Sequence, residues 1–136
     1  MQFCAFRSLV AATAFVLAAP ALAAGGDLEI TFNDHCRECH AFDKDDNRLG
    51  PSLYGVVGRK AGTEPGFAYS QSVKDSGITW DAKTLDNWIA DPQAVIPGND
   101  MSPPFNGISD PAIRKKIIAF LETLSPKSGK KAGKQH

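Results

Sequence analysis

The sequence predicts an all-α domain in which short helices are joined by long, wrapped loops. Three observations lead to this prediction. Apolar residues recur at helical spacing in three segments, no run alternates apolar and polar residues as a half-buried strand does, and glycine and proline interrupt the chain repeatedly between residues 41 and 77. The 136 residues, 43 % of them hydrophobic, fit one globular domain.

The first 24 residues are predicted to be a removable export signal. Arg7 carries a positive charge, residues 9–22 form an Ala-rich apolar run, and Ala21-Leu22-Ala23 has the small-x-small form that signal peptidases recognise. The alternative is a membrane anchor, but the apolar run is shorter than the ~20 residues that a bilayer span needs. We therefore expect a periplasmic mature chain with no transmembrane segment.

The first helical segment of the mature chain covers residues 27–35, where Leu28, Ile30 and Phe32 are apolar, and we expect one or two turns. Residues 41–77 contain too many glycines and prolines for a long helix. Loops of that length are uncommon in a compact domain unless something organises them. A buried prosthetic group is the expected organiser, because it adds apolar surface that a short chain lacks.

Two further helices are predicted in the second half of the chain. Residues 81–91 begin with Asp81 as a potential cap, and Pro92 ends the segment. The last helix has Asp110 as its N-cap and Pro111 at its first position. Its apolar stripe consists of Ile113, Ile117, Phe120, Leu121 and Leu124.

Charge is distributed unevenly along the chain. Residues 25–126 carry ten Lys and Arg against fifteen Asp and Glu, a formal charge of −5, whereas four lysines lie within residues 127–136. We therefore divide the chain into a signal over 1–24, a domain over 25–126 and a lysine-rich tail over 127–136. The acidic domain argues against nucleic acid as a partner.

The cluster Cys36-Arg37-Glu38-Cys39-His40 is a C-x-x-C-H motif, the pattern of c-type haem attachment. Two thiols three positions apart lie on one helical turn, where they can add to the two vinyl groups at one edge of a porphyrin. His40 is then carried beneath the ring, where its imidazole can bind the iron. The predicted cofactors are one covalent haem c and its iron.

Cys36 and Cys39 have alternative uses. A redox-active dithiol belongs in a strand-containing fold, and the sequence predicts no strands. A zinc site needs four ligands, but the mature chain has two cysteines and three histidines, of which His35 and His136 lie in no regular metal-binding spacing. The export signal also favours haem, because it leads to the compartment in which haem c is attached.

Met101 is the predicted second ligand of the iron. Met1 leaves with the signal, so Met101 is the only methionine of the mature chain, and it lies in a proline-framed loop over residues 96–104. A methionine that only fills the core usually lies on a helical stripe instead. A thioether is a neutral ligand that favours ferrous iron and raises the potential.

Residues 26–126 resemble mitochondrial cytochrome c and its bacterial periplasmic relatives, the class I c-type cytochromes. The matching segments occur in the family's order: 36–40, 50–55, 58–62, 65–70, 77–80 and 97–101. The resemblance implies the cytochrome c fold around one haem, with Phe32 and Phe120 paired between the first and last helices. It also implies that the Pro51 carbonyl accepts a hydrogen bond from His40. The residues expected to balance the buried haem propionates are Arg59, Tyr69 and Trp80.

Two departures from the family pattern bear on function. Trp88 occupies a position at which the family commonly has a tyrosine whose hydroxyl approaches the methionine sulfur, so that hydrogen bond is lost or replaced by one from the indole N–H. Mitochondrial lysines around the haem edge are replaced by Gln93, Ala94 and Asp100. We therefore do not expect a partner with the acidic surface that mitochondrial cytochrome c recognises.

These observations predict a soluble, monomeric single-electron carrier rather than an enzyme. With His40 and Met101 both bound, iron has no open position for a substrate, so it would cycle between Fe(II) and Fe(III) in brief encounters with a donor and an acceptor protein. The alternatives are a peroxidase, if Met101 dissociates readily, and a ligand-sensing domain with a free sixth position. The pathway stays open between respiration, photosynthesis and oxidation of a small periplasmic substrate.

Overall fold

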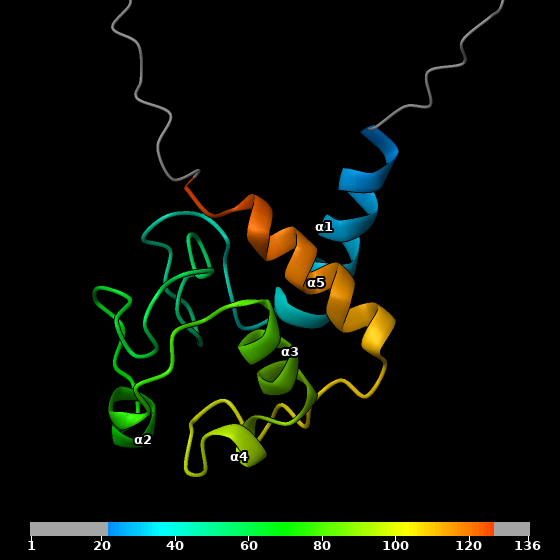
Figure 1. Ribbon diagram of the computed structural model, residues 1–136. Helices are drawn as coiled ribbons and strands as arrows, with labels where there is room; N and C mark the ends of the chain where they lie inside the picture. The colour runs from blue at the N-terminus through cyan, green and yellow to red at the C-terminus, as the bar shows by residue number, and fades with distance from the viewer. Residues whose placement is uncertain (1–21, 127–136) are drawn as a thin grey trace, which may run out of the picture.

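The computed structural model describes residues 22–126, and over this range the chain forms five α-helices joined by loops (Figure 1). The helices are α1 (Leu22–Cys36), α2 (Gln71–Asp75), α3 (Ala82–Ala90), α4 (Pro92–Val95) and α5 (Pro111–Thr123). The same residues contain no β-strand, and one isolated antiparallel bridge joins Lys60 to Thr79. The predicted all-α class is confirmed.

α1 is longer than the one or two turns predicted over residues 27–35, because it extends over 15 residues. The glycines at positions 25 and 26 have low helix propensity and hide the start of the helix in the sequence. Contacts with α5 stabilise α1 in the folded chain, and tertiary packing of this kind outweighs propensity. The helix ends at Cys36, so it positions the first residue of the C-x-x-C-H motif.

α3 lies within the predicted residues 81–91. The Asp81 carboxylate accepts a hydrogen bond from the Thr84 N–H at 2.7 Å, and the Thr84 hydroxyl accepts one from the Asp81 N–H at 2.8 Å, which is a reciprocal capping box. Pro92 ends α3 as predicted, but it also begins α4, whose N-cap is Asp91. The sequence does not reveal α4 because four residues are too few for apolar periodicity.

α5 begins at Pro111 after its cap Asp110, as predicted. It crosses α1 at one side of the molecule (Figure 1). There the Phe32 and Phe120 rings pack with their centroids 5.0 Å apart. Phe42, which follows the C-x-x-C-H motif, packs edge-on against both rings. The expected aromatic pair is therefore present and is part of a cluster of three rings.

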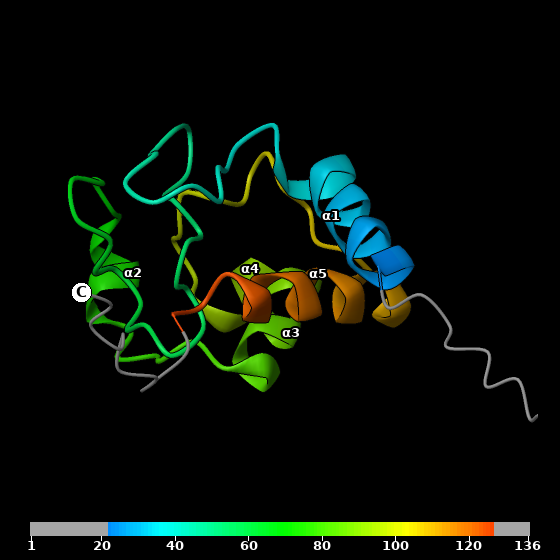
Figure 2. The same cartoon turned by 90° about the horizontal axis from the view of Figure 1, so that it is seen from above.

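The long loops lie on the other side of the molecule. Figure 2 shows the loop after α1, together with α2, at the end away from the start of α1. α2 was not predicted from the sequence: it has five residues, of which only Val73 is buried, so it shows no apolar stripe. Residues of these loops and of α1, α2, α3 and α5 line one cavity.

No helix within residues 22–126 is long and apolar enough to cross a membrane. The signal predicted over residues 1–24 falls almost wholly outside the described range, and so does the tail predicted over 127–136. Both assignments stay predictions.

Candidate cofactor-binding site

All nine residues predicted to bind the cofactor line a single cavity of about 440 Å³. They are widely separated in the sequence and are brought together by the fold: Cys36, Cys39, His40, Pro51, Arg59, Tyr69, Trp80, Trp88 and Met101. Much of the remaining wall is apolar, with contributions from Leu53, Val56, Val73, Leu85, Ile89, Phe105, Ile117 and Leu121. Such a wall suits a large apolar group with a few polar contacts.

His40 is buried, and a backbone oxygen fixes its ring. Its Nδ1 lies 2.8 Å from the Pro51 carbonyl oxygen. A carbonyl can only accept, so Nδ1 carries the proton and donates, which leaves the lone pair on Nε2. Burial lowers the pKa of His40, the bond to Pro51 opposes this shift, and the charge of Arg59 adds to it. The imidazole is therefore neutral and offers Nε2 as a metal ligand.

Gly50 leaves the space that the His40 ring occupies. A Cβ at position 50 would lie 2.2 Å from Cε1 and 2.6 Å from Nδ1 of His40, which is far inside van der Waals contact. The Gly50 N–H also donates to the Cys39 carbonyl at 2.8 Å, so this hydrogen bond holds the loop against the C-x-x-C-H motif. Only glycine allows the backbone to approach the imidazole this closely.

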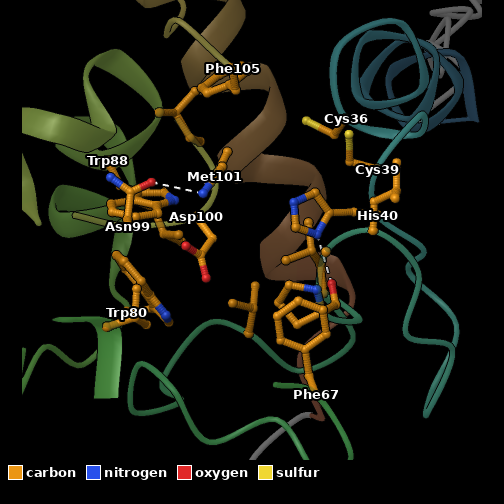
Figure 3. Close-up of a pocket in the computed structure, with 18 of the residues that line it drawn as sticks. Cys36, Cys39, His40, Phe67, Trp80, Trp88, Asn99, Asp100, Met101 and Phe105 are labelled. Carbon is orange, nitrogen blue, oxygen red and sulfur yellow. Dashed lines mark hydrogen bonds between the residues drawn. The ribbon is translucent and has the colours of Figure 1, made fainter. Parts of the chain in front are cut away.

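Cys36 and Cys39 are both free thiols. The His40 N–H donates to the Cys36 carbonyl at 2.9 Å, so a hydrogen-bonded turn follows α1, and both sulfurs lie at the same wall (Figure 3). Burial, and then the charge of Cys39, raise the pKa of the Cys36 thiol to about 12. Redox-active C-x-x-C thiols have lowered pKa values, so this environment argues against that alternative.

Met101 lies across the cavity from His40 and the cysteines (Figure 3). The buried side chain of Asn99 shapes its loop. Asn99 Oδ1 accepts hydrogen bonds from the N–H groups of Met101, at 3.0 Å, and Ser102, at 2.9 Å, while Nδ2 donates to the Ile96 carbonyl at 2.9 Å. A single amide therefore fixes the backbone on both sides of the methionine.

Gln93 makes a second connection across the same loop. Its Oε1 accepts a hydrogen bond from the Gly98 N–H at 3.1 Å, and its Nε2 donates to the Ser102 carbonyl. Gly98 and Ser102 lie three positions before and one position after Met101, so the side chain spans the segment that carries the methionine. Gln93 replaces a lysine expected from the family, and in this chain it has a structural contact.

Trp80 and Trp88 pack against each other on the Met101 side of the cavity, with ring centroids 5.3 Å apart (Figure 3). Trp80 is buried. Within residues 22–126 the structure shows no hydrogen bond between the Trp88 indole and Met101. Trp88 contributes its packing against the Trp80 ring instead. The expected role of Trp80 toward a propionate stays a prediction.

Arg59 reaches the cavity but already has a protein carboxylate as its partner. Its NH1 group forms an ion pair with Glu64, and its NH2 group donates to the Ser52 carbonyl at 2.9 Å. The Tyr69 hydroxyl accepts a hydrogen bond from the Glu64 N–H at 3.3 Å, and burial raises the pKa of Tyr69, so its own proton is retained. The balance of propionate charge by Arg59 and Tyr69 stays a prediction.

Four residues that shape this site were not singled out as site residues by the sequence: Gly50, Glu64, Gln93 and Asn99. Gly50 could have been noticed, because a glycine before a proline in a matching segment often marks close backbone approach. The two amides and Glu64 lie in irregular loops, and no spacing rule identifies their partners.

No protein-family model matches the chain. It is, however, 48 % identical over 89 residues to cytochrome c2 iso-2 of Magnetospirillum fulvum, covering 65 % of this chain and 91 % of the relative. It is 41 % identical over 122 residues to cytochrome c2 of Rhodomicrobium vannielii, covering 88 % and 95 %. The structure of cytochrome cH from Methylobacterium extorquens matches with a TM-score of 0.64 and 46 % identity, covering 74 % of this chain and 96 % of that one.

The chain belongs to the class I c-type cytochromes. Like other members of this family it is a haem c protein, and it is an electron carrier rather than an enzyme. The cavity fits that group: two free thiols and a neutral imidazole lie on one wall, a thioether lies across from them, and the remaining lining is largely apolar. Within residues 22–126 no group of three or more His, Cys, Asp or Glu is placed to hold a metal ion, so the zinc alternative has no ligand set there.

Proposed function

We propose that this c-type cytochrome carries single electrons in the periplasm, with haem c bound through Cys36 and Cys39 and with His40 and Met101 as the two ligands of its iron. The observation that supports this assignment is the placement of Nε2 of His40 and the Met101 side chain on facing walls of one cavity (Figure 3). When bound, haem c provides an iron that gains and loses one electron between Fe(II) and Fe(III).

The residues of the chain determine how that iron behaves. The Pro51 carbonyl holds the His40 ring in one tautomer and increases its strength as a ligand. Asn99 and Gln93 would hold the Met101 loop in place around the bound haem. With His40 and Met101 as its protein donors, the iron would have no position left for a substrate, and the apolar lining would limit the access of water.

We further propose that residues 1–24 are removed on export, which would place the domain in the periplasm as a monomer. Its partners would be a donor and an acceptor protein that dock briefly. The formal charge of −5 over residues 25–126 and the absence of lysine from the cavity lining favour partners unlike those of a lysine-ringed cytochrome. These points rest on composition and on the relatives, which are cytochromes c2.

Substitution of Met101 tests the ligand assignment. In Met101→Ala the oxidised protein should lose the absorption band near the red end that reports iron–sulfur bonding, its potential should fall strongly, and the reduced protein should bind carbon monoxide. A matched control is Leu49→Ala, which shortens an exposed apolar side chain at the same cavity. An unchanged spectrum in Met101→Ala would refute the assignment.

A further inference from the structure

Glu64 is a buried carboxylate next to the cavity that the electron-carrier function has not yet explained. The residue is 9 % exposed, although it lies in a loop between two glycine turns. An acidic side chain is rarely buried to this extent unless it has a partner. Its partner is Arg59. The Glu64 side chain alone is 7 % exposed and the Arg59 side chain is 15 % exposed, so solvent screens the pair only weakly.

The contacts of Arg59 show that this pair is fixed in position. NH1 donates to Glu64 and also to the Tyr54 carbonyl at 3.1 Å, and NH2 donates to the Ser52 carbonyl at 2.9 Å. The Glu64 N–H donates to the Tyr69 hydroxyl at 3.3 Å. Arg59 and Tyr69 line the cavity, whereas Glu64 is not among the lining residues.

We propose that Glu64 is a positioning residue that sets the potential of the haem by offsetting the positive charge of Arg59 and by engaging its guanidinium, so that fewer of its donors are available to the haem propionates. This inference rests on the proposed function. A negative charge near the iron favours Fe(III), and a positive charge favours Fe(II), because like charges repel and opposite charges attract over short distances in a poorly screened interior. Both effects of Glu64 therefore lower the potential.

Redox titration of the matured, haem-containing protein tests the proposal with Glu64→Gln. The substitution keeps the shape of the side chain and removes its charge, so the midpoint potential should rise. The matched control is Asp86→Asn, which neutralises the carboxylate of another Arg pair, 2.7 Å from Arg114 and outside the cavity lining. Asp86→Asn should leave the potential unchanged, and Glu64→Asp, which keeps the charge, should lie closer to wild type than Glu64→Gln does.

Removal of a buried partner can prevent folding, since it leaves Arg59 unpaired. A second comparison includes a variant with no unpaired charge: Arg59→Gln combined with Glu64→Gln removes both members of the pair, whereas Arg59→Gln alone leaves Glu64 as an uncompensated negative charge. The double variant should have a higher potential than Arg59→Gln alone.

The results separate this inference from the proposed function. If the oxidised wild-type protein shows no iron–sulfur band, the proposed function is contradicted, whatever potentials the variants have. With that band intact in the variants, equal potentials in Glu64→Gln and Asp86→Asn, or in Arg59→Gln and the double variant, would overturn the role of Glu64.

Discussion

The two walls of the cavity hold the two proposed iron ligands, His40 and Met101, by different means. On the His40 wall, the ring is fixed by backbone: the Pro51 carbonyl accepts a hydrogen bond from Nδ1, and Gly50 leaves room for the ring. On the Met101 wall, the loop is fixed by side-chain amides, those of Asn99 and Gln93. A backbone contact is lost only if the chain moves, whereas a side-chain contact is lost with one substitution. We therefore expect the His40 wall to be disrupted only by a substitution that displaces the backbone or the ring, and the Met101 wall by the loss of one side-chain amide.

Gly50→Ala tests the His40 wall and should have the strongest effect. The new Cβ would lie 2.2 Å from His40 Cε1, so either the ring or the loop must move. We expect little or no haem-containing protein, measured as absorbance per polypeptide after periplasmic expression. Gly26→Ala is the matched control, because nothing lies within 4 Å of a Cβ at that position, and it should mature normally. Normal haem content in Gly50→Ala would mean that the backbone does not fix this wall.

Asn99→Ala tests the Met101 wall and should have the next strongest effect. It removes the acceptor for two backbone N–H groups and the donor to the Ile96 carbonyl, and each buried group left without a partner costs about 1–3 kcal/mol. We expect haem to be retained but the iron–sulfur band to weaken and carbon monoxide to bind the reduced protein. Asn106→Ala, at an exposed position, should leave both unchanged. A normal band in Asn99→Ala would contradict the role given to this amide.

Gln93→Ala should have a smaller effect on the same wall, because Asn99 still holds the Met101 N–H. The connection between the Gly98 N–H and the Ser102 carbonyl is lost. We expect a stability loss of about 0.5–1.5 kcal/mol per hydrogen bond in urea unfolding, and slow carbon monoxide binding. Gln71→Ala is the control, since the Gln71 amide contacts only Asp75 on the surface. Equal stability and equal carbon monoxide binding in Gln93→Ala and Gln71→Ala would contradict the role given to Gln93.

Asp81 is not among the cavity-lining residues, so a substitution there shows the effect of a stability change that does not involve the haem site. Hydrogen bonds from Thr84 lower the pKa of the Asp81 carboxyl in the folded chain. A lowered folded pKa means that the contribution to stability is present above the unfolded pKa and is lost as the pH falls through the folded value. Asp81→Ala should therefore reduce stability slightly at neutral pH and not at strongly acid pH, without changing the iron–sulfur band. Unfolding curves at several pH values measure this, and a pH-independent difference would contradict it.

The sequence predicted most of the His40 wall, but not the role of Gly50. Cys36, Cys39 and His40 are contiguous in a motif whose spacing follows from the chemistry, and the Pro51 contact followed from the family resemblance. The capped helices α3 and α5 were also predictable, because their caps and apolar faces are local signals.

The sequence was not sufficient for the other wall. Met101 could be proposed as the only methionine of the predicted mature chain, but the residues that support it could not, since Gln93 lies in a four-residue helix and Asn99 in an irregular loop. Their hydrogen-bond partners are backbone groups, which every residue has. The sequence pattern therefore does not indicate which residues these side chains contact. The burial of Glu64 is equally hidden, because it depends on the path of a loop that folds around the cofactor.

Visible spectra of the wild-type protein, expressed in the periplasm and recorded in both redox states, test whether His40 and Met101 both bind the iron. The account predicts haem c absorbance that persists after denaturation, an iron–sulfur band in the oxidised state at neutral pH, and no binding of carbon monoxide on reduction. A colourless protein after full maturation, or a reduced protein that binds carbon monoxide freely, would contradict it.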